Sequence, residues 1–339
     1  MKLSIAIGML AAAAWVAPAT TRVSVSPPER FVSTDVLLDA RTYGESDWIA
    51  IKDPSIVFHD GRWHMFNTLR GHERSHAMTY TSFETFEQMG EQKPVVLENH
   101  DGYWAAPQVF FFEPHGKWYM VSQGSKPAWE PDAMHAVFCT NDDVSDPTGW
   151  TSPEKMDVAR PPGDNPVPFI DFWVICDDET AYIFFTTDNG KMWRSETSID
   201  AFPFGWGETV LALESDLFEA SHIYRLPEAD VYVNLVEREA GGGRRAFDLY
   251  VADELDGAWR PWSDDGEKLY ALPEVNVDFP GEPWTISISH GELIRRGVDQ
   301  RMEADLDAPF VYQGISSEDM RGVGYGKIPW KLGLLRPAE

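Results

Sequence analysis

Residues 53–66 have the sequence Asp-Pro-Ser-Ile-Val-Phe-His-Asp-Gly-Arg-Trp-His-Met-Phe, which carries the clearest signal for the fold. Two runs rich in aromatic and β-branched residues flank an Asp-Gly pair, and this arrangement is a strong signal for a β-hairpin. The same order of polar residue, apolar run, turn and second apolar run recurs from Pro107, Asp171, Glu219 and His290. In the last repeat, the turn is expected at 298–300 and the second strand at 301–302. The chain therefore predicts five β-hairpins.

The spacing of these hairpins predicts how they assemble. Their starts lie 54, 64, 48 and 71 residues apart. Repeats of about this size, each with several strands, are typical of propeller blades. No long segment has the 3.6-residue period of an amphipathic helix. We expect an all-β, five-bladed β-propeller, with a β-sandwich as the alternative. Residues 35–339 form one domain in this interpretation, and residues 20–34 form an extended lead-in.

The charge of the chain limits its partners. Lysine and arginine number 28 against 55 aspartates and glutamates, which gives a net charge of −27. A surface this acidic repels phosphate backbones and anionic lipids, so neither nucleic acid nor a membrane is an expected partner. A neutral substrate meets no such penalty. We expect a soluble monomer.

The N-terminus resembles an export signal. Lys2 precedes an apolar run over residues 3–16, and Ala17-Pro18-Ala19 fits the small-residue cleavage rule. We expect residues 1–19 to be a signal peptide and the mature protein to be secreted, extracellular or periplasmic. The two cysteines, Cys139 and Cys176, are too few for a disulfide scaffold or a zinc site, and they leave a single disulfide as an open alternative.

The propeller arrangement predicts a cluster of titratable groups. The first strand of each blade lines the central axis, so residues at equivalent positions converge at one end of the channel. Four of the five hairpins open with Asp53, Asp171, Glu219 or His290. When carboxylates lie this close, the pKa of at least one of them rises. A protonated carboxyl group beside an ionised one is the arrangement that glycosidases use to cleave a glycosidic bond.

Several motifs resemble glycoside hydrolase family 62. They are Ile51-Lys52-Asp53-Pro54, Ala106-Pro107-Gln108-Val109-Phe110, residues 170–178 beginning Ile-Asp-Phe-Trp, residues 184–194, Asp216-Leu217-Phe218-Glu219-Ala220, and Ile288-Ser289-His290-Gly291-Glu292. They occur in the family's order over about residues 45–337. The resemblance implies a secreted, inverting α-L-arabinofuranosidase with a five-bladed propeller, related to family 43, that removes side chains from arabinoxylan or arabinan.

The resemblance also implies roles for individual residues. Asp53 matches the general base, Glu219 the general acid, and Asp171 the carboxylate that orients the sugar and raises the pKa of the acid. His290 matches a residue near a structural calcium ion on the propeller axis, where calcium's preference for oxygen ligands favours contact through water. The remaining matches fall in the arabinose pocket: Lys52, Pro107, Gln123, Ile170, Asn189 and Tyr325.

The chain departs from the family pattern on the polysaccharide side of the site. Residues 122–125 read Ser-Gln-Gly-Ser where the family commonly has Tyr-Gln-Trp-Gly, which leaves Trp129 as a substitute to be tested. Ile286 and Ser287 replace an Asn-Asp pair, and Asp248 stands where the family tends to have arginine. The polymer is therefore less defined than the released sugar. Alternatives are a β-xylosidase, an endo-arabinanase and a non-catalytic glycan-binding propeller.

Overall fold

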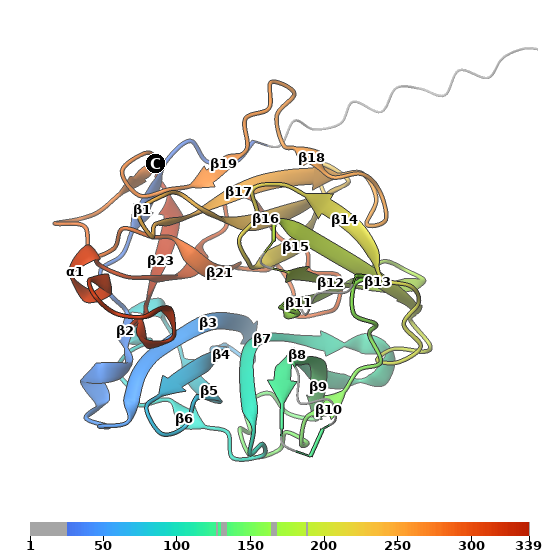
Figure 1. The fold of residues 1–339 in the computed structure, drawn as a ribbon, viewed down its shortest axis with the longest axis horizontal. Helices are drawn as coiled ribbons and strands as arrows, with labels where there is room; N and C mark the ends of the chain where they lie inside the picture. Colours follow the sequence, from blue (N-terminus) through green and yellow to red (C-terminus); the bar gives the residue numbers. More distant parts are fainter. Residues whose placement is uncertain (1–25, 127, 130–133, 164–167, 188, 339) are drawn as a thin grey trace, which may run out of the picture.

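The structure is a computed structural model, and it describes residues 26–126, 128–129, 134–163, 168–187 and 189–338. Five sheets surround a common axis and form a five-bladed β-propeller, as expected (Figure 1). Their strands pair antiparallel except β1 and β20, which pair parallel. The predicted signal peptide, residues 1–19, lies outside the described residues. None of the helices described is long and apolar enough to cross a membrane.

Each of the first four sheets is a meander whose first strand lies nearest the axis. Blade 1 contains β3 (Trp48–His59), β4 (Arg62–Gly71), β5 (His76–Phe83) and β6 (Val95–Val96). Blade 2 contains β7 (Tyr103–Phe112), β8 (Lys117–Ser125), β9 (His135–Asn141) and β10 (Glu154–Lys155). Blade 3 contains β11 (Ile170–Cys176), β12 (Thr180–Thr187), β13 (Lys191–Ser198) and β14 (Val210–Glu214). Blade 4 contains β15 (Ser221–Leu226), β16 (Val231–Glu239), β17 (Arg245–Ala252), β18 (Arg260–Pro261) and β19 (Leu269–Ala271).

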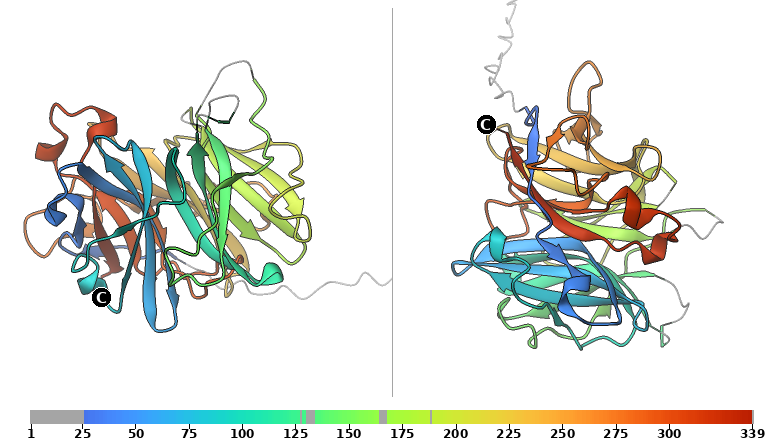
Figure 2. Two further views of the ribbon diagram at one scale, coloured as in Figure 1. Left: turned by 90° about the horizontal axis from the view of Figure 1, so that it is seen from below. Right: turned by 90° about the vertical axis from the view of Figure 1, so that its left-hand side faces the viewer.

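The fifth blade joins the two ends of the chain. It contains β21 (Ser289–Leu293), β22 (Phe310–Gly314), β23 (Lys331–Pro337), β1 (Phe31–Ser33) and β20 (Val277–Asp278), with β2 (Leu38–Asp39) also paired to β23. Figure 2 shows the blue β1 beside the red β23, and the two strands pair antiparallel. The expected lead-in therefore includes a strand of the propeller itself.

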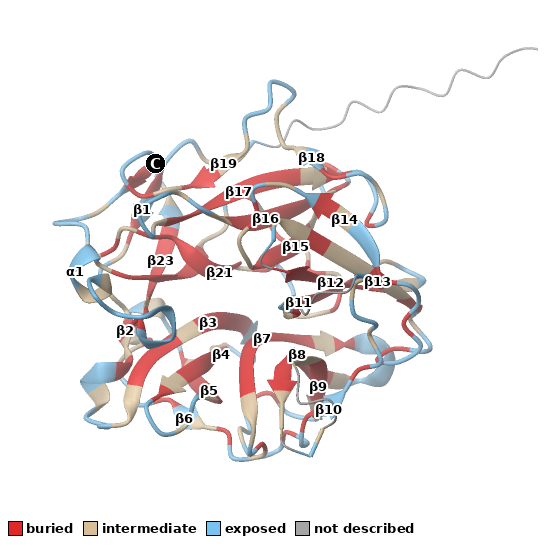
Figure 3. Cartoon of the chain, viewed as in Figure 1, coloured by how far each residue is buried: buried red, intermediate tan, exposed pale blue. Residues whose placement is uncertain are grey.

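The remaining helical elements are short. They are η1 (Ala40–Tyr43), η2 (Phe86–Gln88), η3 (Glu113–His115), α1 (Ser317–Met320) and η4 (Tyr325–Lys327). The core lies between the blades, where large aromatic side chains such as Trp104 and Trp173 are fully buried. Figure 3 shows these buried strands around the axis and exposed loops at the rim. Both cysteines are buried and free, so the disulfide left open by the sequence is not formed.

Four of the five predicted hairpins are confirmed, and the turn of the fifth was wrong. β21 pairs with β22, so residues 294–309 form a long connection instead of a turn and a strand at 301–302. This connection crosses the channel end opposite the starts of the inner strands. Its carbonyl groups at Val298, Gln300 and Met302 accept hydrogen bonds from the backbone of Phe111, Cys176 and Arg225 in blades 2, 3 and 4 (2.7, 2.9 and 3.1 Å). A turn pattern in the local sequence cannot predict hydrogen bonds to such distant strands.

Candidate active site

A kink at the start of the inner strands shapes the site. Asp53, Ala106, Asp171 and Ala220 all have left-handed backbone, with φ between 49° and 56°. In blades 1, 2 and 3 the kink coincides with a shift in the pairing register. Such a φ costs an ordinary L-residue roughly 1–2 kcal/mol, so the surrounding structure must hold it.

Side chains of the preceding blade hold these kinks through their backbone N–H groups. The N–H of Asp53 donates to Gln313 Oε1 (2.8 Å), that of Ala106 to Thr68 Oγ1 (2.8 Å), and that of Asp171 to Gln123 Oε1 (2.9 Å). Continuing around the ring, Ala220 donates to Asp171 Oδ2 (2.9 Å) and His290 donates to Glu237 Oε2 (2.7 Å). This ring of five contacts connects every blade to the next one at the end of the channel.

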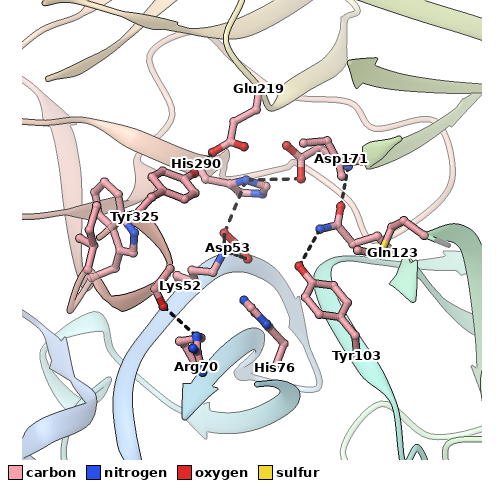
Figure 4. A pocket seen from close by; sticks show the side chains of 15 residues that line it. Lys52, Asp53, Arg70, His76, Tyr103, Gln123, Asp171, Glu219, His290 and Tyr325 are labelled. Atoms are coloured by element: carbon pink, nitrogen blue, oxygen red, sulfur yellow. Dashed lines mark hydrogen bonds and ion pairs between the residues drawn. The ribbon is translucent and has the colours of Figure 1, made fainter. Parts of the chain in front are cut away.

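The ring brings the predicted charged residues into one pocket of about 260 Å³. Figure 4 shows Asp53, Asp171, Glu219 and His290 facing one another across it. The lining residues come from all five blades and the C-terminal segment: Lys52, Asp53, Arg70, His76, Tyr103, Gln123, Met134, Ile170, Asp171, Glu219, His290, Tyr325, Gly326, Ile328 and Trp330.

Asp53 is held in its ionised form. The residue is 3% exposed, and its carboxylate lies 3.0 Å from the Lys52 ammonium and 3.6 Å from His290 Nδ1. Burial opposes ionisation, but Lys52 and then His290 outweigh it and lower the pKa of Asp53 below its usual value. Asp53 is therefore a carboxylate base at neutral pH.

Glu219 has the opposite electrostatic environment. Removal of its carboxyl group from solvent, followed by the charge of Asp171, raises its pKa well above the usual glutamate range. The Tyr325 hydroxyl donates a hydrogen bond to Glu219 Oε1 and fixes its orientation. Asp171 also accepts the N–H of Ala220, the residue after Glu219, so it both orients this segment and favours its protonation.

His290 lies between the two aspartates. Its Nδ1 is 3.6 Å from Asp53 Oδ1 and 4.0 Å from Asp171 Oδ1. Burial lowers its pKa, so the imidazole is neutral at neutral pH. Glu237, a fully buried carboxyl group, holds this segment by accepting hydrogen bonds from the N–H of His290 and from Ser289 Oγ (2.8 Å).

Replacing Glu237 with glutamine tests this support. The amide cannot accept both hydrogen bonds and keep the contact with Arg245 at 3.5 Å, so His290 loses its fixed position between the aspartates. We expect Glu237→Gln to lower kcat by up to about 10²-fold with little change in KM, because a displacement of catalytic groups by about 1 Å can cost that much. Steady-state kinetics on an aryl glycoside measures this.

Glu239→Gln is the matched control for that variant. Glu239 is exposed and contacts the same Arg245 at 3.1 Å. We expect wild-type kinetics from it. Equal losses of kcat in both variants would assign the effect to Arg245 and would contradict the role of Glu237 in positioning His290.

Two residues expected in the pocket do not line it. Pro107 is buried in β7, and Asn189 is exposed in the turn after β12, where its Oδ1 accepts a hydrogen bond from Thr187 Oγ1 (2.7 Å). Trp129 does not line the pocket either: it packs against His100 and His135, with the Lys126 and Lys155 ammonium groups over its ring.

Other lining residues escaped the sequence analysis. Arg70, His76 and Tyr103 are the main ones. The aromatic ring of Tyr103 forms part of the pocket wall, and its hydroxyl accepts a hydrogen bond from Gln123 Nε2 (3.2 Å). Glu237 was also missed. It occupies the same position on β16 as Gln313 does on β22, and this recurrence of polar residues on second strands was the available signal.

The site does not fit a directly coordinated calcium ion. Calcium takes six to eight oxygen ligands. Among the described residues, no group of three His, Cys, Asp or Glu side chains is arranged to hold a metal ion. Around His290, Glu237 is committed to backbone and serine donors, and Asp53 is paired with Lys52.

The chain matches known proteins over most of its length. The sequence model "Glycosyl hydrolase family 62" matches residues 30–336. Alpha-L-arabinofuranosidase C of Cellvibrio japonicus (strain Ueda107) is 36% identical over 318 residues, which is 91% of this chain and 47% of that protein, so the chain spans about half the length of this curated relative.

Solved structures match the whole propeller. The catalytic domain of the GH62 α-L-arabinofuranosidase of Coprinopsis cinerea is 35% identical, with a TM-score of 0.80 over 91% of this chain and 97% of that one. The α-L-arabinofuranosidase PaAbf62A of Podospora anserina, in complex with cellotriose, is 31% identical, with a TM-score of 0.80 over 94% and 99% of the two chains.

Proposed function

The chain belongs to glycosyl hydrolase family 62, and we propose that it is an inverting, exo-acting α-L-arabinofuranosidase. Its substrate in this proposal is an arabinofuranosyl side chain on arabinoxylan or arabinan. The observation that carries the proposal is the pair of carboxyl groups with opposed environments in one pocket: Asp53, ion-paired with Lys52, and Glu219, whose pKa is raised.

The opposed pKa values assign the two roles. Glu219 keeps its proton near neutral pH, so it can protonate the departing glycosidic oxygen. Asp53 is ionised, so it can take a proton from a water molecule that attacks the anomeric carbon from the opposite face. Lys52 keeps Asp53 charged, and Asp171 orients the sugar and maintains the high pKa of Glu219.

The shape of the pocket supports an exo-acting enzyme. A cavity of about 260 Å³ suits a single sugar ring better than a polymer backbone. The segment around Tyr325 and Gly326 closes one side of it, with Gly326 O accepting a hydrogen bond from Arg70 Nε (2.8 Å). The relative from Podospora anserina is in complex with cellotriose. We place the β-linked backbone of the substrate outside this pocket.

The test is an analysis of products from wheat arabinoxylan and sugar-beet arabinan. We expect free arabinose as the sole low-molecular-weight product from at least one polymer, with the backbone length unchanged by size-exclusion chromatography. Shortened backbone chains would instead identify an endo-acting enzyme. Absence of arabinose from both polymers and from an aryl arabinofuranoside would contradict the proposal.

We also propose that residues 1–19 direct export and that the enzyme is a monomer. The basic Lys2, the apolar run and the Ala-Pro-Ala sequence support the first point. N-terminal sequencing of the protein from its native host tests it, with an expected start after Ala19. A start at Met1 would contradict it. Light scattering at micromolar concentration tests the second point.

The calcium ion expected near His290 stays a prediction with its own test. Because the described side chains do not enclose such an ion directly, it would be held largely by water. A bound ion stabilises the folded state by mass action. EDTA should then lower the melting temperature by several degrees, and added Ca²⁺ should restore it. An unchanged melting temperature removes calcium from the account.

A further inference from the structure

Arg70 is unusual among the cations of this acidic protein. Most described lysines and arginines lie within 4.0 Å of a carboxylate, as Lys52 and Arg74 do. The exceptions in the described ranges are Arg70, Lys126, Lys155, Arg160, Arg321 and Lys327. Among these exceptions, Arg70 is the residue that lines the pocket.

The guanidinium of Arg70 is held in place without being neutralised. Its Nε donates to Gly326 O (2.8 Å) and its Nη1 donates to Ser75 O (3.0 Å), so two backbone carbonyls from different loops fix its plane. Figure 4 shows Arg70 and His76 on the same side of the pocket as Lys52. Neutral carbonyl acceptors leave the positive charge of the group uncompensated.

The pocket meets a neighbouring groove at His76, the residue that pairs with Arg70 across strands β4 and β5. The groove is lined by Glu73, Arg74, Ser75, His76, Asp101, Gly102, Tyr103, Ser125 and Lys126, so His76 and Tyr103 belong to both cavities. The rings of these two residues lie 4.3 Å apart and form the boundary. Carboxylates and cations balance within the groove, so they do not offset the charge of Arg70.

His76 does not supply this positive charge. Burial, followed by the nearby Lys52, lowers the pKa of His76 to about 3. His76 is therefore a neutral hydrogen-bonding group at neutral pH, and Lys52 is neutralised by Asp53. The net positive charge on this side of the pocket belongs to Arg70.

We propose that Arg70 binds a carboxylate on the substrate, a uronate unit on the polysaccharide close to the arabinofuranosyl side chain. With Nε and one Nη1 hydrogen already donated to carbonyls, Nη2 and the second Nη1 hydrogen remain. This terminal edge of the planar guanidinium matches a carboxylate in two parallel hydrogen bonds, which ammonium groups do not offer. A chain with a net charge of −27 repels acidic polymers, so a local cation at the pocket mouth is the feature that would admit one. This inference rests on the proposed function and specifies its substrate.

The test compares one polymer with and without its carboxylates. Glucuronoarabinoxylan is used as such and after chemical reduction of its uronates to neutral sugars. We expect the wild type to release arabinose about fivefold faster, in kcat/KM, from the acidic polymer at low salt, the upper range for an accessible ion pair. Arg70→Gln should bring this ratio to one or below, because the acidic surface then repels the polymer, and 0.5 M NaCl should reduce the wild-type ratio.

The ratio within each variant is the readout, so a general loss of activity from a loosened Gly326 loop cancels. Arg321→Gln removes the same charge from an exposed arginine outside the pocket lining and should keep the wild-type ratio. A wild-type ratio of one, or an Arg70→Gln ratio that stays at five, would overturn the assignment. If the wild type had no activity on an aryl arabinofuranoside, that result would instead contradict the proposed function.

Discussion

Asp53→Asn should lower kcat by about 10²–10⁴-fold on every arabinofuranoside, activated or natural. Asparagine has the shape of aspartate but cannot accept the proton of the attacking water, and general-base catalysis contributes about 10²–10⁴-fold. Leaving-group quality cannot compensate, because the lost step is activation of the nucleophile. Initial rates on an aryl arabinofuranoside and on arabinoxylan measure the effect.

The fold should tolerate this substitution. Residue 53 has φ 51°, and asparagine accepts left-handed backbone as readily as aspartate does. Its N–H keeps its contact with Gln313 Oε1. The melting temperature should therefore stay close to the wild-type value. Asp60→Asn is the matched control, because Asp60 is exposed, also left-handed with φ 47°, and lies in the same hairpin. It should have wild-type rates. Wild-type rates for Asp53→Asn would reject Asp53 as the base.

Glu219→Gln should give a loss that depends on the leaving group. The aglycone of a natural arabinoside is a poor alkoxide leaving group and needs a proton to depart. We therefore expect the rate on arabinoxylan to drop about 10²–10⁴-fold. The dinitrophenolate of an aryl arabinofuranoside departs without protonation, so the rate on that substrate should fall less than tenfold. The ratio of the two losses measures the general-acid role.

The exposed Glu214 offers a control for this variant. It lies at the end of β14, 4.0 Å from Lys191 and outside the pocket lining, and Glu214→Gln should leave both rates unchanged. Equal losses on both substrates in Glu219→Gln would contradict the assignment of Glu219 as the acid.

The pH profile should change with the same residue. Glu219 must be protonated, and desolvation followed by the Asp171 charge raises its pKa to about 8. In the wild type, kcat/KM on arabinoxylan should fall as the pH rises through this region, because the acid loses its proton. Asp53, whose pKa is lowered, limits the rate only under strongly acidic conditions. The residual activity of Glu219→Gln on arabinoxylan should lack this alkaline limb.

Much of the blade architecture could be predicted from local sequence. The hairpins opening at Asp53, Pro107, Asp171 and Glu219 have strands joined by short turns, so aromatic patterning and turn residues locate them. The fifth hairpin has its partner strand beyond a connection that closes the channel. β1 pairs with a strand about 300 residues away. Neither pairing is encoded in a local pattern.

The site followed the same division. Asp53, Asp171 and His290 lie on inner strands, and Glu219 lies just before one, so the repeat places them together. Arg70 and Glu237 lie on second strands, and they reach the site from positions that no inner-strand register marks. Their roles depend on contacts with Gly326 and His290, which belong to another blade or to the C-terminal segment. Trp129 failed as a substitute wall because it packs against His100 and His135 instead.

Proton NMR of the sugar first released by the wild type tests whether Asp53 activates water on the face opposite the departing oxygen that Glu219 protonates. Enough enzyme is added for an aryl α-L-arabinofuranoside to be hydrolysed faster than the released arabinose mutarotates, and the anomeric proton signals are followed over time. This mechanism predicts that β-arabinose forms first and that the α anomer follows only by mutarotation. The α anomer forming first would indicate retention through a covalent intermediate and would contradict the assignment of Asp53 as a general base.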